Sequence, residues 1–251
     1  MNADLPAGTD ALPSHAPADP SIDRAGSAWL TSALAEVARD PDSITRAFAF
    51  AARRVGRAPR RPDVDPAGVV HGTVDDAARA ALVVALADAV GTGPDCAERL
   101  VSLYRHGDAA ERRGVLRGLD ALTERGSLGR SDTDIDAAPE PGPDTTPVSG
   151  GDAAALVRAG LDLAADALRA NDPSLVAAAV GAFGSLHLDQ HTWRHAVLKL
   201  VFQGVSLQAV HDLEARADDE LDRMARDFAA ERRAAGRPVP TDLDRLSTTK
   251  E

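Results

Sequence analysis

The clearest helical pattern in the chain is in residues 213–236, LEARADDELDRMARDFAAERRAAG. Apolar side chains recur in it at steps of four, four, three and four, the spacing of one helix face. These residues are Leu213, Ala217, Leu221, Met224 and Phe228. On the polar side, Asp219 precedes Arg223 by four residues and Asp222 precedes Arg226 by the same step. That order favours surface ion pairs, so the stretch predicts an amphipathic helix.

The arginine-rich end of this stretch has a structural explanation. Gly236 can take the left-handed conformation that ends a helix, and Pro238 prevents continuation. Arg232 and Arg233 stand near the negative end of the helix dipole, where cations are favoured. We therefore interpret residues 228–240 first as a helix end, and only second as an anion site.

Composition extends the helical prediction to the whole chain of 251 residues. Apolar residues make up 44% of it, much of that alanine, and aromatic residues make up 3%. Alanine is the best helix former and a poor strand former. The sequence therefore predicts an all-α fold with a core of leucine, valine and alanine.

Charge and cysteine content limit the function classes. The net charge of −11 argues against non-specific nucleic-acid binding. The single cysteine, Cys96, excludes an internal disulfide and fits a reducing compartment. Residues 2–20 are acidic and proline-rich, unlike a signal peptide, and no run is long and apolar enough to span a membrane. We expect a cytoplasmic protein without membrane insertion.

Two segments have the composition of disordered chain. These are residues 1–24 and an acidic Pro/Gly-rich loop at 126–150. The loop separates two helical blocks, 25–125 and 151–246, of a single domain at 25–246. In the first block, Thr73 and Asp76 resemble a capping box, which would open a central apolar helix at 77–90. In the second block we expect helices at 152–170, 173–186, 190–203, 206–216 and 218–235.

One internal similarity suggests repeats. Residues 107–122, GDAAERRGVLRGLDAL, align with residues 171–186, NDPSLVAAAVGAFGSL, with Asp at the second position of each. Apolar side chains match along the alignment, for example Leu119 with Phe183. The pattern resembles the helical hairpins of HEAT-like α-solenoids. Because alanine-rich helices also match by chance, a HEAT-like array of about nine helices is a prediction with an open alternative.

Several short motifs resemble the EboA-domain family. They are WRHAVLKLVF at 193–202, ARA at 215–217, ERRAAGR at 231–237, FAFAARRVGR at 48–57 and LRAN at 168–171. The family has Trp-Asn-Gln where this chain has Trp193 followed by Arg194 and His195. It has Arg-Ala-Asn where this chain has RAD at 216–218, and its Asn-Pro-Tyr-Pro turn is replaced by GSLH at 184–187. The resemblance is therefore to a divergent member.

The resemblance implies a role in secondary metabolism. The family accompanies a prenyltransferase and enzyme-like proteins in operons implicated in moving metabolite precursors toward the cell envelope. A member would be a non-enzymatic adaptor or carrier that binds a small apolar or prenylated ligand, or a partner from its pathway such as the membrane prenyltransferase. The polar residues that match its motifs are Arg169, Lys199, Glu231, Arg232 and Arg237.

Residues 53–61, RRVGRAPRR, hold five arginines and no acid. Arginine presents a rigid fork that suits phosphate and carboxylate, so Arg53, Arg54 and Arg57 could bind an anionic headgroup or an acidic partner. Neutralisation by the acidic loop at 132–144, or a simple solvated loop, are the alternatives. With Arg169 and Arg237 they would form the clamp of the rival function, an enzyme acting on a phosphorylated or pyrophosphorylated intermediate.

Other candidates have simpler explanations. Lys199 lies on an apolar face and either extends to the surface or pairs with a carboxylate, for which Glu231 is a candidate. Trp193, Glu231, Arg232 and Gly236 are candidate structural braces. His191 and His195 are four residues apart and could share a metal, but no third ligand has suitable spacing. Without a glycine-rich phosphate loop or a nucleophile elbow, we predict no catalytic residue, no metal and no cofactor.

Overall fold

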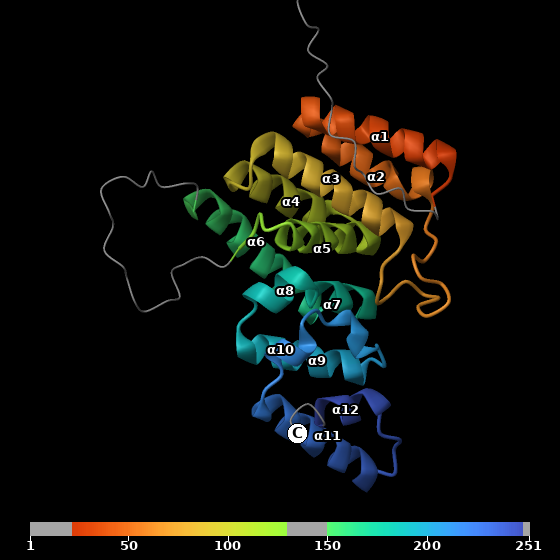
Figure 1. Ribbon diagram of the computed structural model, residues 1–251, viewed down its shortest axis with the longest axis vertical. Coiled ribbons are helices and arrows are strands. Elements are labelled where there is room, and N and C mark those ends of the chain that lie inside the picture. The colour runs from red at the N-terminus through yellow and green to blue at the C-terminus, as the bar shows by residue number, and fades with distance from the viewer. Residues whose placement is uncertain (1–21, 130–149, 248–251) are drawn as a thin grey trace, which may run out of the picture.

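The computed structural model describes residues 22–129 and 150–247, and all the regular elements in these two ranges are helices. Outside the helices, an isolated antiparallel bridge joins Pro59 and Thr73. The all-α prediction is thus confirmed for the described residues. Most of the expected tail at 1–24 and of the acidic loop at 126–150, including 132–144, lies outside them. The helices follow one another along an elongated molecule, from α1 at one end to α11 and α12 at the other (Figure 1).

The N-terminal part is organised around α3. Its elements are α1 (Arg24–Arg39), η1 (Pro41–Ser43), α2 (Ile44–Val55), α3 (Val74–Val90), α4 (Pro94–His106) and α5 (Ala109–Glu124). Helices α1, α2, α4 and α5 all pack against α3, and Val74, Leu82 and Leu86 are fully buried. The helix expected to be central is therefore central, and it begins three residues earlier than predicted.

The start of α3 confirms the capping box. The Oδ2 atom of Asp76 accepts the backbone N–H of Thr73 at 2.9 Å.

The close contact between α3 and α5 depends on two glycines of α5 that lie one helical turn apart. A Cβ on Gly114 would lie 2.5 Å from the Arg79 side chain, and one on Gly118 would lie 2.6 Å from Val83. Both contacts are too short, so only glycine lets α3 approach α5 this closely.

Buried charged residues lie on α3 itself and pair within that helix and with α5. Arg79 pairs with Asp75 at 2.5 Å, with side chains 2% and 1% exposed, and its Nε donates to the carbonyl of Phe48 at 3.2 Å. Arg113 on α5 pairs with Asp76 at 2.8 Å. These partners satisfy charges that would otherwise be costly to bury.

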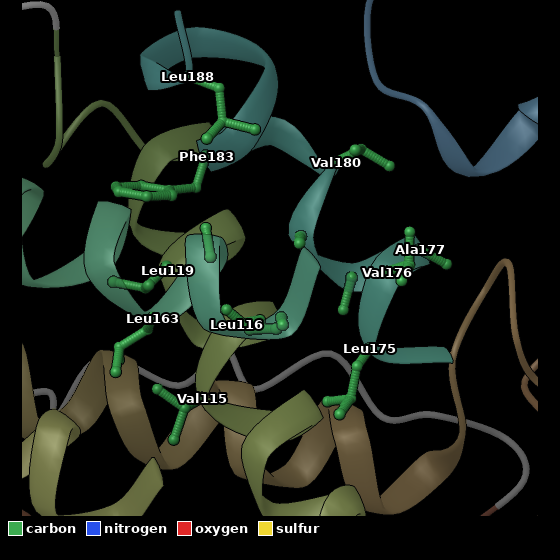
Figure 2. Packing of buried hydrophobic residues seen from close by; sticks show 14 of the residues in the cluster. Val115, Leu116, Leu119, Leu163, Leu175, Val176, Ala177, Val180, Phe183 and Leu188 are labelled. Atoms are coloured by element: carbon green, nitrogen blue, oxygen red, sulfur yellow. The ribbon is translucent and has the colours of Figure 1, made fainter. Parts of the chain in front are cut away.

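The C-terminal part contains α6 (Gly150–Arg169), α7 (Pro173–Ala179), α8 (Ala182–His187), α9 (Gln190–Phe202), η3 (Leu207–Ala209), α10 (Leu213–Arg216), α11 (Asp219–Ala234) and α12 (Thr241–Ser247). It joins the N-terminal part through a core in which α5, α6, α7 and α8 meet. Figure 2 shows Leu119, Leu163, Val176 and Phe183 from these four helices around that core, and all four side chains are buried.

The helix expected at 173–186 is wrong in one respect, because it is broken into α7 and α8. The carboxylate of Asp120, from α5, accepts the backbone N–H of Phe183 at 3.0 Å and so caps α8. A Cβ on Gly181 would lie 2.1 Å from Asp120 Oδ2, so glycine is needed there. Since α5 is a single helix, the two similar segments differ in structure, and the HEAT-like repeat stays a prediction.

One other expectation needs correction. The helix expected at 206–216 is instead η3 and α10, separated by Asp212, whose φ is +51°. At the start of the predicted loop at 126–150, Gly126 follows α5 in the left-handed conformation and Leu128 is fully buried.

Candidate functional site

The arginine-rich segment begins at the end of α2. Arg53 and Arg54 lie in the last turn of this helix, Arg57 follows Gly56, and all three are exposed. The guanidinium of Arg53 lies over the Phe50 ring, 5.5 Å from its centroid. Within the described parts of the chain, neither Arg53 nor Arg54 forms an ion pair. These cations are therefore available to an anionic ligand.

Arg54 borders a groove between α1 and α2 with a volume of about 290 Å³. The groove is lined by Trp29, Ser32, Ala33, Glu36, Arg46, Ala47, Phe50 and Arg54. Phe50 is 40% exposed, a high value for a large apolar side chain. Apolar and aromatic surface thus lies beside a cation in one groove, an arrangement that suits an amphiphilic anion.

Charges along the groove are unevenly paired. Glu36 on α1 forms an ion pair with Arg46 on α2 across the groove. This carboxylate is therefore engaged with Arg46, and Arg54 is left as the cation that a ligand can use. Among the described residues that line the groove, Glu36 is the one carboxylate, so none of them offers Arg54 a second acid.

Sequence reasoning missed two residues of this groove. They are Trp29 on α1 and Phe50 on α2. The signal for Phe50 was present, because Ile44, Phe48 and Ala51 define the buried face of α2 and Phe50 lies off it. An aromatic residue outside the apolar face of an amphipathic helix points to an exposed contact surface.

The five arginines of the proposed enzyme clamp do not converge. Arg169 lies in the last turn of α6, where its side chain is 70% exposed and pairs with Asp166 at 3.4 Å. Arg237 follows α11, at the end of the molecule opposite α2 (Figure 1). Arg53, Arg54 and Arg57 remain together, so this group alone is retained as the anion-binding candidate.

Lys199 has a different partner from the one proposed. Its Nζ donates to the backbone carbonyls of Leu168 and Ala170, at 2.5 and 2.8 Å. These carbonyls lie at the C-terminal end of α6, whose last C=O groups lack partners within the helix. Lys199 therefore ties α9 to the end of α6, and pairing with Glu231 is not needed to explain it.

A second set of family-matched residues forms a bracing centre around Trp193. This side chain is fully buried, and the guanidinium of Arg216 lies 5.0 Å from its ring centroid. Arg216 also donates to Gln190 Oε1 and to backbone carbonyls of the α8 end at Gly184, Ser185 and Leu188. Cation–π and charge-assisted hydrogen bonds of this kind hold α8, α9 and α10 together.

Two departures from the family pattern contact each other. Arg194 forms an ion pair with Asp218, and Asp218 also caps α11 by accepting the N–H of Leu221 at 3.0 Å. The hydrogen bonds from Arg194 lower the pKa of Asp218 far below its usual value. The family motifs that the sequence resembles have asparagine at both positions, so in this chain two opposite charges stand where those motifs have two amides.

The structure confirms that the ERRAAGR motif at 231–237 forms a helix end. Gly236 has φ +65°. The N–H of Arg237 donates to the carbonyl of Arg232 at 2.9 Å, and that of Gly236 to Arg233 at 3.0 Å, the Schellman pattern. Arg232 donates from Nε to the Pro238 carbonyl at 2.6 Å and lies over the Phe228 ring. Glu231 is exposed beside them.

The remaining candidates show no reactive geometry. The rings of His191 and His195 pack together, with centroids 4.3 Å apart, and His195 Nδ1 lies 3.0 Å from the His191 carbonyl oxygen. Across the described ranges, no group of three potential metal ligands comes together. Cys96 is buried, and burial raises the pKa of its thiol to about 12, which leaves it protonated at neutral pH.

Comparison with known proteins supports the resemblance in the C-terminal part. A family model described as "Metabolite traffic protein EboA" matches residues 160–248. This stretch contains Lys199, the Trp193 centre and the ERRAAGR motif, whereas the FAFAARRVGR segment at 48–57 lies outside it. No curated protein and no solved structure matches the chain. In the described ranges, no helix is long and apolar enough to cross a membrane.

Proposed function

We propose that this protein is a non-enzymatic carrier in metabolite traffic that holds an amphiphilic anion, such as a prenyl phosphate, in the groove between α1 and α2. The family description supports the metabolite-traffic role, through residues 160–248. The observation that carries the ligand class is the position of Arg54 beside the aromatic side chains of Trp29 and Phe50. The carrier would act in the cytoplasm, on a HEAT-like stack of helices.

The apolar and the cationic parts of the groove each suit one part of such a ligand. Trp29, Ala33 and Phe50 offer apolar area to a hydrocarbon chain, whose burial contributes roughly 25 cal/mol per Å². Arg54 offers the planar fork that binds phosphate oxygens. The volume of about 290 Å³ is at the lower end for small-molecule sites, so part of a long prenyl chain would stay outside. A partner that receives the ligand could grasp that exposed part.

A carrier agrees better with this groove than an enzyme does. Phosphoryl or pyrophosphate chemistry needs a base or a metal beside the cationic clamp. The carboxylate of Glu36 is engaged by Arg46, and the arginines of the proposed clamp are dispersed over α2, α6 and the segment after α11. The enzyme alternative therefore has no assembled centre among these residues.

The adaptor version of the function rests on a separate feature. Phe202 is 57% exposed and packs edge-on against Phe228, with ring centroids 4.1 Å apart. Both residues belong to the family-matched stretch. Native mass spectrometry of protein purified from its own host separates the two versions, because a carrier retains a small molecule and an adaptor retains a pathway protein such as the prenyltransferase.

Tryptophan fluorescence tests the carrier directly. The chain has two tryptophans, and Trp193 is fully buried, so Trp29 should report on the groove. Farnesyl phosphate should quench the emission and shift it to shorter wavelength. Arg54→Glu should weaken farnesyl phosphate at least about tenfold but leave farnesol unchanged, because it removes one charge-assisted contact. Phe50→Ala should weaken both ligands.

The matched control is Arg105→Glu, which reverses an exposed arginine in the last turn of α4, away from the groove lining. It should bind farnesyl phosphate as the unaltered protein does. Equal weakening by Arg54→Glu and Arg105→Glu would mean that only net charge matters, and no saturable binding by either ligand would refute the carrier.

A further inference from the structure

The positive surface at the end of α2 continues past the groove into the loop that joins α2 to α3. Residues 50–64, FAARRVGRAPRRPDV, contain five arginines and one acid, Asp63, in a chain whose net charge is −11. All five arginines are exposed, and Arg54 is the one of them that lines the groove. This end of the molecule therefore carries more positive charge than the groove uses.

Helix geometry accounts for only part of this charge. Arg53 and Arg54 lie in the last turn of α2, where the helix dipole favours cations. Arg57 and Arg61 come after the helix, and neither side chain forms an ion pair with a residue that the structure describes. Their charges are therefore available to an anionic surface outside the molecule.

An exposed apolar residue lies beside these arginines. Val64 is 65% exposed, and its N–H donates to the carbonyl of Arg61 at 3.2 Å, which keeps the two residues in one turn. Three large apolar residues are exposed in the described ranges, and two of them, Phe50 and Val64, belong to the segment 50–64. Exposed apolar side chains that gather in one segment point to a contact surface.

The loop that carries Val64 is held in a fixed shape. The carboxylate of Asp65, itself buried, accepts the backbone N–H groups of Val69, Val70 and His71, at 3.0, 2.9 and 2.7 Å. The ends of the loop are joined by the bridge between Pro59 and Thr73. Figure 1 shows this loop extending away from the ends of α2 and α3. Because the loop is already ordered, presenting Val64 to a partner costs little conformational entropy.

We infer that this surface, which consists of Arg53, Arg57, Arg61 and Val64 and is called the docking surface below, binds an anionic lipid membrane without crossing it. Clusters of four or more basic residues are attracted to the negative charge of anionic lipids, and each contributes about fivefold to the affinity. The side chain of Val64 enters the boundary between headgroups and hydrocarbon.

The shape of the docking surface favours a membrane over an acidic peptide. Arg57, Arg61 and Val64 do not line the groove, and they lie on a loop that projects from the helices (Figure 1). A projecting loop fits a broad surface, whereas a peptide is usually held in a groove or along a sheet edge.

The acidic character of the whole chain does not prevent this contact. At physiological ionic strength, charges more than about 8 Å apart in water are largely screened from each other. The local balance of five arginines against Asp63 therefore decides the attraction. Glu36, the acid of the neighbouring groove, is already paired with Arg46.

Docking would bring the groove to the membrane. Arg54 borders the groove and is adjacent in sequence to Arg53 of the docking surface. An amphiphile with a hydrocarbon chain resides in the bilayer, so the carrier would load and release its ligand at the lipid surface. This step rests on the proposed function, whereas the docking itself does not.

Cosedimentation of the full chain with lipid vesicles, in the absence of farnesyl phosphate, tests the docking. The protein should bind phosphatidylcholine vesicles that contain about 30% phosphatidylserine and should not bind pure phosphatidylcholine. The double variant Arg57→Gln/Arg61→Gln should weaken binding at least about twentyfold, because it removes two cations. Since neither residue lines the groove, this variant should bind farnesyl phosphate normally.

The matched control is Arg158→Gln/Arg233→Gln, which neutralises two exposed arginines on α6 and α11. It should bind the phosphatidylserine vesicles as the unaltered protein does. Val64→Ser changes no charge and should weaken vesicle binding about fivefold, since it removes the apolar contact. Poly-L-glutamate, which offers negative charge without a hydrocarbon layer, should bind Val64→Ser and the unaltered protein equally.

Three results would overturn the inference. They are no binding to phosphatidylserine vesicles, equal weakening by the two double variants, and binding to poly-L-glutamate that depends on Val64, which would indicate an acidic protein partner. Failure of vesicle binding with intact farnesyl phosphate binding refutes the docking alone. Vesicle binding without any farnesyl phosphate binding refutes the carrier alone.

Discussion

The two ends of the molecule hold their helices together by different means. In the N-terminal part, the ion pair of Arg79 with Asp75 is shielded from water, with side chains at most 2% exposed. In the C-terminal part, α11 buries only Leu221, Ala225 and Ala229, and its ion pairs, such as that of Arg226 with Asp222, are exposed. Removing one partner of a buried ion pair therefore lowers the free energy of unfolding much more than removing one partner of an exposed pair.

This difference follows from how each helix is surrounded. Other helices pack against α3 on several sides, so even its charged residues are in a low-dielectric setting. Helix α11 packs mainly against α12 and reaches the rest of the molecule through contacts such as that of Phe228 with Phe202. Its ends are therefore stabilised by caps rather than by burial.

The largest expected effect is at the buried pair. Arg79→Ala leaves the Asp75 carboxylate buried without its cation and should lower the free energy of unfolding by about 3–5 kcal/mol. Urea denaturation measures this loss. The control is Arg226→Ala, which breaks an exposed pair of the same i, i+4 spacing and should cost about 0.5 kcal/mol or less. Similar costs for the two variants would contradict the contrast between the ends.

An intermediate effect is expected at Arg216. Lysine keeps the charge but cannot donate simultaneously to Gln190 and to the carbonyls at the end of α8. We therefore expect Arg216→Lys to cost about 2 kcal/mol, measured by thermal or urea unfolding. Arg223→Lys, which alters only exposed pairs on α11, should be nearly neutral. If the cost at Arg216 were equally small, the bracing centre would contribute only packing.

The smallest effect should come from the end of α11. Gly236→Ala places a Cβ in the left-handed conformation and should cost about 1 kcal/mol. Gly236→Asn should cost less, because asparagine tolerates that conformation better. Chemical denaturation of both variants checks the order. An alanine variant as stable as the unaltered protein would mean that this helix end frays.

Much of the fold could be predicted because it depends on local signals. The apolar spacing of α11, the capping box of Thr73 and Asp76, and the helix end at Gly236 all lie within a few residues of the element they define. The break between α7 and α8 could not be predicted, because it requires Asp120, which is 63 residues from Phe183. The helical spacing of apolar residues continues through Gly181, so by itself it predicts one unbroken helix.

The candidate sites were harder to predict for the same reason. Arginines at 53–57 stand out in the sequence, but the groove beside Arg54 needs Trp29 from another helix. Similarly, Glu231 was a candidate partner of Lys199, because the sequence does not show that the carbonyls at the end of α6 lie within reach of this lysine.

The cap of Asp120 on α8 also bears on where this molecule can be divided. The matched stretch begins at residue 160, after α5 has ended, so it contains α8 without the carboxylate that starts it. A fragment excised at that boundary would lack its own initiation signal for α8 and would present Phe183 and Leu163 to solvent. The stretch matched by the family model is thus shorter than the set of helices that pack together, because the cap of α8 comes from α5.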